Sequence, residues 1–239
     1  MELFYSTKIK DNKIILDKEE SNHCIKVLRY NIGDTINVVD GAGSMYEGTL
    51  IDVVNKECIV EIIKTINQFK NKDYYIHIGI SAVKNHSRME WFVEKAVEIG
   101  VDEISIMNCN RTINKSIRKN RINRIAKSAM KQTIKAKLPI INYNVSFERF
   151  IQHSFKGNKY ICHLNKEIAQ TLFDYRSDFK CEKSCILIGP EGDFTEDEVS
   201  LALKENFIEI TLGNSRLRTE TAGIVACNLL NVIYESKKK

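Results

Sequence analysis

The sequence predicts a protein of two domains, a small β-rich domain followed by a larger α/β domain with a largely parallel sheet. Short alternating strands separated by glycine and aspartate turns fill the first 70 residues, whereas strands and helices alternate from residue 74 onward. Between these two patterns, residues 67–73 are polar and have no periodicity. We therefore place the domain boundary between residues 70 and 71, and the 239 residues are enough for two hydrophobic cores.

The N-terminal domain is expected to begin with a short strand at residues 13–16 and one or two helical turns at residues 22–29. Residues 33–66 then alternate β-branched with polar residues, and their turns are Gly33-Asp34, Asp40-Gly41 and Asn55-Lys56. Repeated short strands joined by such turns suggest a small barrel. Any other β-rich accessory domain fits this pattern equally well.

The C-terminal domain is expected to open with a strand at residues 74–83 and a helix at residues 87–99, whose apolar residues recur at helical spacing. A strand at residues 103–107 and a longer helix at residues 117–136 follow. The remaining expected elements, with further helices between them, are strands at 159–164, 185–189 and 207–212 and a terminal helix at 219–235. This alternation predicts the parallel sheet.

One long stretch of the chain carries only positive charge. The formal net charge is +5, yet residues 104–147 contain ten basic residues and no acidic one. Within the expected helix, four of these residues share one face away from the apolar stripe: Arg124, Lys127, Lys131 and Lys135. A solvated helix face usually mixes both signs, so we favour nucleic acid over an ordinary solvated face as the explanation. The pattern indicates a polyanion without saying which one.

Several classes of protein are disfavoured by what the sequence lacks. The seven cysteines form no Cys-x-x-Cys pair and complete no zinc-ligand spacing with the five histidines, so we expect buried reduced thiols and no metal. No apolar run reaches the length of about 18 residues that a membrane helix needs, and the N-terminus resembles no signal peptide. We therefore expect a soluble cytoplasmic protein. Dinucleotide-binding, P-loop and nucleophile-elbow motifs are also missing.

Two short motifs follow expected strands and are candidates for ligand contact. Residues 188–195, IGPEGDFT, place two glycines at a strand end, where the backbone can turn sharply and approach a ligand. Residues 212–222, LGNSRLRTETA, again join a strand to a helix, and Thr219 is a plausible cap. Arg218 has no comparable local role. A plain connection, or a helix start with a surface arginine, accounts for these residues about equally well.

Five motifs occur in order over nearly the whole chain: NHCIKVLRYNIGD (22–34), RMEWFVEKAVEIGVDEI (88–104), MKQTIKAKLP (130–139), GPEGDF (189–194) and LRTETA (217–222). Together they resemble the ribosomal small-subunit methyltransferase E family of the SPOUT methyltransferases. The resemblance implies an N-terminal PUA-like β-barrel, residues 1–70, that acts as an RNA-binding accessory domain. It implies a C-terminal α/β domain, residues 71–239, tied in a trefoil knot, and a homodimer with active sites near the subunit interface.

The resemblance also implies an activity, which is transfer of a methyl group from S-adenosylmethionine to N3 of a uridine in 16S ribosomal RNA, at position 1498 of the usual RNA numbering. The substrate would be the RNA or the assembled 30S subunit. Two other functions stay open. One is a SPOUT enzyme that acts on another ribosomal or transfer RNA site, and the other is a non-catalytic RNA-binding or assembly factor.

Particular residues take roles from the same resemblance. Three loops at strand ends would form the cofactor pocket, with His163, Leu164, Ile188, Gly189, Pro190, Glu191, Gly192, Leu212, Gly213, Leu217, Arg218, Thr219, Thr221 and Ala222. Arg218 would stabilise negative charge that develops on the uridine, and Glu191 and Glu220 are weaker candidates for the base. The residues expected to contact RNA are Arg29, Lys84, Arg88, Arg111, Arg121, Arg124, Lys127, Lys131 and Lys135.

Some positions depart from the family pattern. Asp193 stands where a third glycine is common, and Lys135 stands where an arginine is usual. Ser215 and Arg216 replace an arginine followed by an aliphatic residue, and Asn110 replaces a glutamate. These departures concern individual RNA contacts more than the fold or the cofactor.

Overall fold

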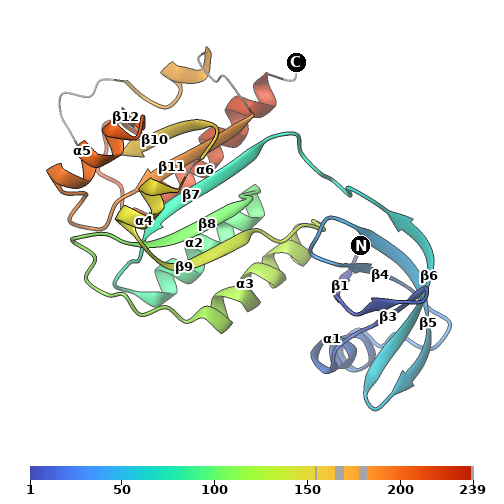
Figure 1. Ribbon diagram of the computed structural model, residues 1–239. Coiled ribbons are helices and arrows are strands. Elements are labelled where there is room, and N and C mark those ends of the chain that lie inside the picture. Colours follow the sequence, from blue (N-terminus) through green and yellow to red (C-terminus); the bar gives the residue numbers. More distant parts are fainter. Residues whose placement is uncertain (154, 165–169, 178–181, 238–239) are drawn as a thin grey trace. The chain divides into compact units, whose positions relative to one another are not determined.

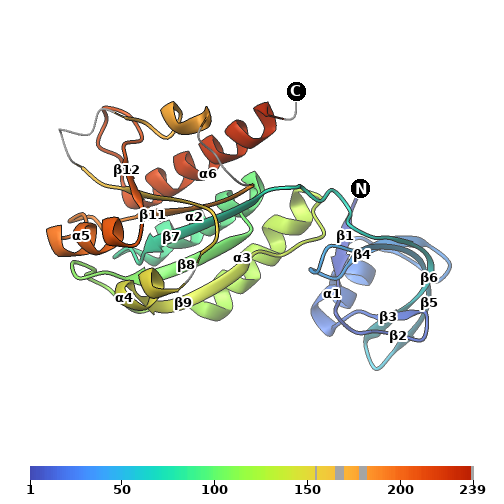
Figure 2. The ribbon, with the colours of Figure 1, turned by 45° about the horizontal axis from the view of Figure 1, so that its top comes forward.

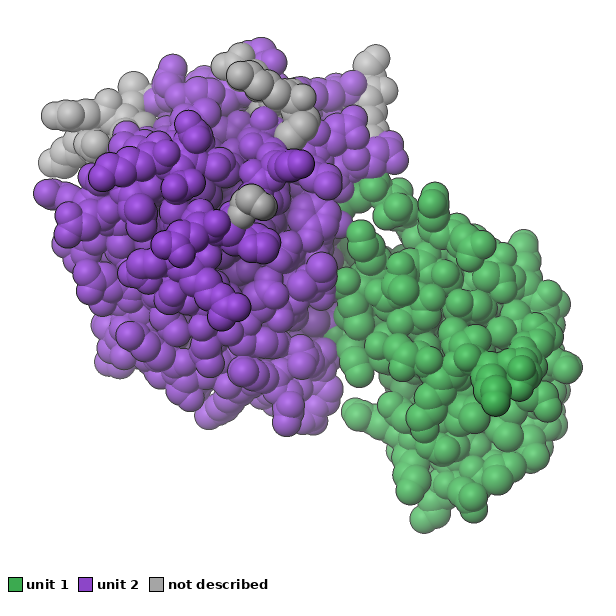
Figure 3. All heavy atoms as spheres, viewed as in Figure 1, with its two compact units in different colours: residues 1–72, 127–138 green, residues 73–126, 139–239 purple. Residues whose placement is uncertain are grey.

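The computed structural model describes residues 1–153, 155–164, 170–177 and 182–237 (Figure 1). The chain divides into two compact units, which Figure 3 colours separately. Unit 1 comprises residues 1–72 and 127–138, and unit 2 comprises residues 73–126 and 139–239. Helix α3 (Lys119–Gln132) crosses this division, so its second half belongs with the N-terminal region.

Unit 1 is built on a curled six-stranded sheet in the order β1-β4-β5-β6-β3-β2 (Figure 2). Its strands are β1 (Leu3–Tyr5), β2 (Ile9–Lys10), β3 (Lys13–Ile15), β4 (Thr35–Val39), β5 (Met45–Val54) and β6 (Glu57–Ile66). β1 pairs with β4 in parallel, and the other pairings are antiparallel. Asn55 and Lys56, at φ 51° and 68°, form the two-residue turn between β5 and β6, as a hairpin with the usual strand twist requires.

Helical turns pack against this sheet and complete its core. Asp17 caps α1 (Lys18–Asn22) by accepting hydrogen bonds from two backbone N–H groups of the first turn, so the helix starts before the segment expected at residues 22–29. The chain continues as the wider turn η1 (His23–Val27). The buried cluster consists of Phe4, Ile14, Leu16, Cys24, Ile36, Val38, Leu50, Cys58 and Val60. The β-rich N-terminal region is thereby confirmed.

Basic residues in the second half of α3 contact other residues of unit 1. The Lys127 ammonium lies 4.5 Å from the ring centre of Tyr5, and Lys131 forms an ion pair with Glu20. Gly41, at φ 78°, approaches the same ring so closely that a Cβ would lie 2.9 Å from it. Two lysines of the expected RNA-binding face therefore already have partners within this unit.

Unit 2 contains a six-stranded parallel sheet in the order β12-β10-β11-β7-β8-β9. Its strands are β7 (Tyr75–Ser81), β8 (Glu103–Asn108), β9 (Ile140–Ser146), β10 (Asn158–Cys162), β11 (Lys183–Ile188) and β12 (Ile208–Ile210). The central strands β7 and β11 are buried along almost their whole length, as expected for a parallel sheet that is covered on both faces. The predicted α/β class with a parallel sheet is confirmed.

Helices cover the two faces of this sheet (Figures 1 and 2). Helices α2 (His86–Ile99) and α6 (Thr219–Ser236) pack together on one face, where a Cβ at Gly223 of α6 would lie 2.6 Å from Phe92 and 3.0 Å from Ile80. Helices α4 (Phe147–Gln152) and α5 (Glu196–Lys204) cover the other face, where Phe150 packs near Leu187. A short 3-10 turn, η2 (Asp174–Ser177), precedes β11.

After β12 the chain returns from the edge of the sheet to its middle. β12 is an edge strand, whereas α6 packs on β7 and β11. Residues 211–218 therefore cross the carboxyl ends of β10 and β11. The Thr219 hydroxyl donates a hydrogen bond of 3.0 Å to the Gly189 carbonyl, which ties this crossing to the loop after β11. Three loops meet at this end of the sheet.

Among the described residues, no helix is long and apolar enough to cross a membrane, and no group of three or more His, Cys, Asp or Glu side chains could hold a metal ion. The described cysteines are free thiols: Cys24, Cys58, Cys109, Cys162, Cys185 and Cys227. Burial raises the pKa of the Cys109 and Cys162 thiols to about 12, so both stay protonated at neutral pH. Cys181 lies outside the described residues.

Candidate functional site

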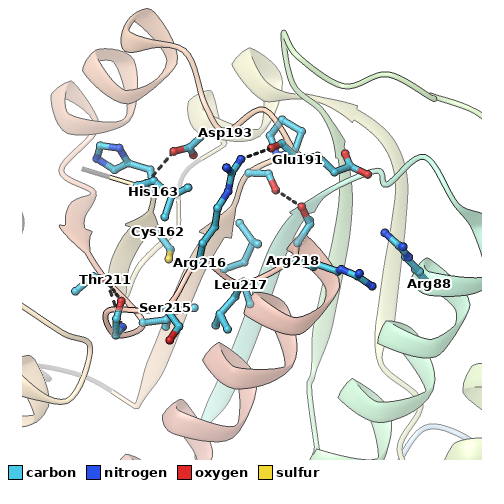
Figure 4. Close-up of a pocket in the computed structure, with 18 residues that line it drawn as sticks. Arg88, Cys162, His163, Glu191, Asp193, Thr211, Ser215, Arg216, Leu217 and Arg218 are labelled. Carbon is cyan, nitrogen blue, oxygen red and sulfur yellow. Dashed lines mark hydrogen bonds between the residues drawn. The ribbon is translucent and has the colours of Figure 1, made fainter. Parts of the chain in front are cut away.

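A pocket of about 340 Å³ lies at the carboxyl ends of β10, β11 and β12 (Figure 4). This volume is in the range of small-molecule sites, and carboxyl strand ends are where open α/β sheets bind ligands. The lining residues are Arg88, Cys162, His163, Leu164, Ile188, Gly189, Pro190, Glu191, Asp193, Thr211, Leu212, Gly213, Ser215, Arg216, Leu217, Arg218, Thr219 and Ala222. Residues far apart in the sequence thus share one cavity.

Asp193 joins the loop after β11 to the loop after β10. Its carboxylate accepts one hydrogen bond from the backbone N–H of Leu164 (2.8 Å) and another from that of Phe194 (2.8 Å). The residue adopts a left-handed backbone conformation, with φ 64°, which favours glycine. This conformation would suit the glycine that the family resemblance implies at this position, and the aspartate here adds a link between two walls of the pocket.

The third loop is joined to the second one. The Arg216 guanidinium donates to the Glu191 carbonyl over 3.4 Å, and Thr219 donates to Gly189 as described above. Gly213, at φ 117°, allows the chain to turn after β12. Interloop hydrogen bonds therefore preorganise the pocket.

Almost every residue expected at the cofactor site lines this pocket. Of that set, only Gly192 and Thr221 do not line the pocket. The Gly192 carbonyl instead accepts a hydrogen bond of 2.7 Å from the Arg111 guanidinium. The sequence did not assign Cys162, Asp193, Thr211, Ser215 and Arg216 to the cofactor. Four of them directly adjoin expected site residues, and Ser215 lies two residues from Gly213 and from Leu217. Adjacency to a loop motif was the signal available for them.

Three charged residues of the lining lie at one side of the pocket. In Figure 4, Arg88, Glu191 and Arg218 lie on the side opposite Thr211 and Ser215. Arg218 is exposed, and its side chain forms neither a cap nor an ion pair with any described residue. Glu220 does not line the pocket. It is buried, with 6% of its surface exposed, and its Oε1 lies 3.5 Å from Nε of Arg88.

The pocket has the chemistry that a nucleoside carrying a sulfonium requires. Ile188, Leu217 and Ala222 supply apolar surface, and the loops supply backbone N–H and C=O groups for a planar base and hydroxyls. Gly189 has Phe194 only 3.1 Å from the position of a Cβ, so a larger residue there would crowd the loop. The residues present therefore fit S-adenosylmethionine, the cofactor expected from the sequence.

The residues expected to contact RNA differ in whether they already bond other protein groups. Lys84 and Arg88 lie near the pocket, whereas Arg111 uses its guanidinium to bond the carbonyls of Gly192 and Phe194. Arg29 and Arg124 are exposed and make no described ion pair, and Lys135 donates to Thr133. Arg121 pairs with Glu90 at 2.7 Å. Some of these cations thus have structural partners.

We expect Arg121→Ala to destabilise the protein, because Glu90 would lose its only described ion-pair partner. The Glu90 side chain is 10% exposed, and its other oxygen, Oε1, has no hydrogen-bond partner among the described residues. Arg121 itself is 58% exposed, which reduces the expected loss to about 1–3 kcal/mol. Thermal and urea unfolding measure this loss. Arg124→Ala, on the same helix, should change stability by less than about 0.5 kcal/mol, and equal losses in both variants would contradict the role of Glu90.

Comparison with known proteins gives a consistent result. Residues 70–231 match the model of the RNA methyltransferase domain, and residues 16–63 match that of the RNA methyltransferase PUA domain. Ribosomal RNA small subunit methyltransferase E of Mesomycoplasma hyopneumoniae (strain 232) is 30% identical, and the alignment covers 92% of this chain and 95% of that one. The protein of that name from Buchnera aphidicola subsp. Acyrthosiphon pisum (strain APS) is 27% identical, with 97% and 98% covered.

Solved structures agree. A probable rRNA-methyltransferase from Porphyromonas gingivalis has 36% identity and a TM-score of 0.90, with 99% of this chain and 100% of that chain covered. Ribosomal RNA small subunit methyltransferase E from Neisseria gonorrhoeae, bound to S-adenosyl methionine, has 25% identity and a TM-score of 0.85, with 98% of each chain covered.

Fold and pocket together define the class of two-domain RNA methyltransferases, with an α/β domain of the SPOUT type and a PUA-like barrel. Both the family models and the TM-scores support this class, so the predicted fold class is confirmed. Within the class, the chain belongs to the ribosomal RNA small subunit methyltransferase E family.

Proposed function

We propose that this protein transfers a methyl group from S-adenosylmethionine to N3 of a uridine in 16S ribosomal RNA, at position 1498 of the usual numbering. The observation that carries the proposal is the three-loop pocket with Arg218 on one side, whose guanidinium pairs with no described residue. Relatives with the name ribosomal RNA small subunit methyltransferase E support the substrate class. Action on 16S RNA or on the 30S subunit would place the protein in the cytoplasm.

The pocket residues would hold and orient the cofactor, which supplies an electrophilic methyl group on a sulfonium. Backbone groups of the three loops would bind its base and hydroxyls, and Ile188, Leu217 and Ala222 would exclude water from the sulfonium side. Neutral Cys162 adds apolar surface. The chain's main contribution is alignment of the attacking nitrogen with the methyl carbon, since positioning lowers such barriers substantially.

Arg218 is the residue proposed to stabilise the negative charge that N3 deprotonation spreads over the uracil oxygens. Glu191, which lines the same side of the pocket and accepts the backbone N–H of Lys84 (3.2 Å), is the candidate to accept the N3 proton. Glu220 is the other candidate from the sequence. Because it is buried against Arg88 and outside the lining, we now propose a positioning role for it.

The activity test is incubation of the protein with isotopically labelled S-adenosylmethionine and either naked 16S RNA or 30S subunits from a strain that lacks the modification. Mass spectrometry of nuclease digests should show labelled 3-methyluridine in the fragment that contains position 1498. Label in another RNA fragment or in transfer RNA would support the alternative substrate. Calorimetry that detects no cofactor binding would favour the non-catalytic RNA-binding factor.

We also propose a homodimer, formed through an apolar stripe on α6. Ile224, Val225, Leu229 and Val232 are all at least partly exposed, at the helical spacing of one face. Trp91 on the neighbouring helix α2 is 43% exposed. Exposed apolar surface of this extent on two packed helices is typical of a protein interface.

The dimer should dissociate when Val232 is replaced by glutamate, because the charge would be buried in the interface. Sedimentation velocity should show a dimer for the wild type and a monomer for Val232→Glu. The single tryptophan, Trp91, gives a second readout, since its emission should shift to longer wavelength on dissociation. Val53→Glu, an equally apolar exposed position in β5, is the matched control and should remain dimeric. A monomeric wild type would refute the proposal.

A further inference from the structure

A second hollow adjoins the proposed cofactor pocket. It has a volume of about 680 Å³ and is lined by Lys84, Asn85, His86, Ser87, Arg88, Ile113, Arg118 and Glu191. Arg88 and Glu191 line both hollows, so the two spaces share a wall. This volume is also in the range of ligand sites, and the shared wall brings any occupant next to the proposed methyl donor.

The lining of this second hollow is strongly positive. It has three cationic side chains against one carboxylate. Within the described part of the chain, Lys84 and Arg118 make no side-chain ion pair, and Glu191 uses one oxygen to accept the backbone N–H of Lys84. Two unpaired cations at one opening attract an anion, and the phosphate of a nucleotide is the anion that an RNA substrate brings.

Arg88 stands between the two hollows, and a buried partner orients it. Its Nε lies 3.5 Å from the Glu220 carboxylate, whose side chain is 8% exposed, while the Arg88 side chain is 41% exposed. A guanidinium that is held at Nε still has four N–H donors on its two terminal nitrogens. Because Arg88 lines both spaces, those donors can reach the oxygens of a planar group placed there.

We infer that the second hollow receives the target nucleotide, with its phosphate against Lys84 and Arg118 and its base oxygens at Arg88, which Glu220 positions. This inference rests on the proposed function, since it assigns the substrate side of the same site. Ile113, 68% exposed at the rim, offers apolar surface to the base or ribose. Glu220 is a positioning residue in this arrangement, because it acts through Arg88.

The first test measures binding without catalysis, with uridine 5′-monophosphate and uridine as probes of the full-length protein. The wild type should prefer the monophosphate, and Lys84→Ala and Arg118→Ala should remove most of that preference. Lys204→Ala removes an exposed lysine at the end of α5 and serves as the matched control. Equal preferences in Lys84→Ala, Arg118→Ala and the control would overturn the inference. This binding test does not require methylation, so it tests the role of the second hollow by itself. A protein that binds the nucleotide there but methylates no RNA would contradict only the proposed function.

The second test separates binding from positioning in the methylation assay. Lys84→Ala and Arg118→Ala should each raise KM for RNA and reduce the salt slope of RNA binding by about one, with affinity for S-adenosylmethionine unchanged. Glu220→Gln and Arg88→Lys should instead lower kcat about tenfold at saturating substrates, because the fork is no longer oriented. Unchanged kcat in both of these variants, or a matching loss of cofactor affinity, would overturn the role of Arg88.

Discussion

Arg218→Ala is expected to lower the rate of methylation at least about a hundredfold while it leaves the affinity for S-adenosylmethionine nearly unchanged. Arg218 occupies the N-cap position of α6, yet its side chain makes no capping hydrogen bond, and it is exposed beside the pocket. Its loss should therefore cost little stability. Removal of one preorganised donor to a developing negative charge usually costs two to three orders of magnitude in rate.

The assay is single-turnover methylation with cofactor affinity from calorimetry on the same preparations. Arg218→Lys should recover part of the rate, since the charge stays but the planar fork is lost. Arg149→Ala removes an exposed arginine on α4, which covers the other face of the sheet, and should turn over like the wild type. Arg218→Ala that turns over like Arg149→Ala would refute the assignment.

The sequence predicted the central part of the fold because burial there follows simple patterns. β7 and β11 are buried along almost their whole length, and α2 ends at Ile99, the predicted last residue of that helix, where Gly100 follows at φ 117°. β9 was not predicted. Among the described strands it pairs only with β8 at the sheet edge, and it contains two asparagines and is only partly buried, so no clear periodicity marks it.

Helix α3 ends earlier than its charge pattern indicates. The sequence predicts a helix over residues 117–136, but α3 stops at Gln132, and Ile134 has φ 54°, a conformation that a β-branched residue rarely adopts. Contacts of the following segment with unit 1, such as the Leu138 N–H to Gly41 carbonyl hydrogen bond of 2.9 Å, hold the chain in this turn. Such tertiary contacts cannot be deduced from local spacing.

At the site, the loops that line the pocket could be predicted from the sequence, but the hydrogen bonds and ion pairs between distant segments could not. Strand–turn–helix motifs placed most of the pocket lining at the correct end of the sheet. The pairing of Arg88 with Glu220 could not be predicted, since the two residues are far apart in the chain and no periodicity links them. The same holds for Arg111, whose charge predicted RNA contact although it bonds the loop carbonyls of Gly192 and Phe194.

Replacement of Asp193 by glycine is expected to weaken binding of S-adenosylmethionine about tenfold or more. Glycine keeps the left-handed backbone, at φ 64°, but removes the carboxylate that accepts the N–H groups of Leu164 and Phe194. Hydrogen bonds to a charged group contribute about 1.5–3 kcal/mol, and their loss frees the loop after β10 from the loop after β11. Cofactor binding would then have to order these two loops, and this cost would make the net free energy of binding less favourable.

Two further variants separate the hydrogen bonds from backbone strain. Asp193→Ala should lose the same affinity and should unfold at a lower temperature than Asp193→Gly, because a Cβ in the left-handed region costs about 1–2 kcal/mol. Asp193→Asn keeps one carbonyl acceptor and tolerates this backbone, so it should bind with intermediate affinity. The calorimetric Kd of each variant reports the effect of the lost hydrogen bonds on cofactor binding, and its Tm reports the backbone strain. If Asp193→Gly binds the cofactor as tightly as the wild type, the carboxylate does not preorganise the pocket; if Asp193→Ala matches Asp193→Gly in Tm, the backbone at this position relaxes without strain.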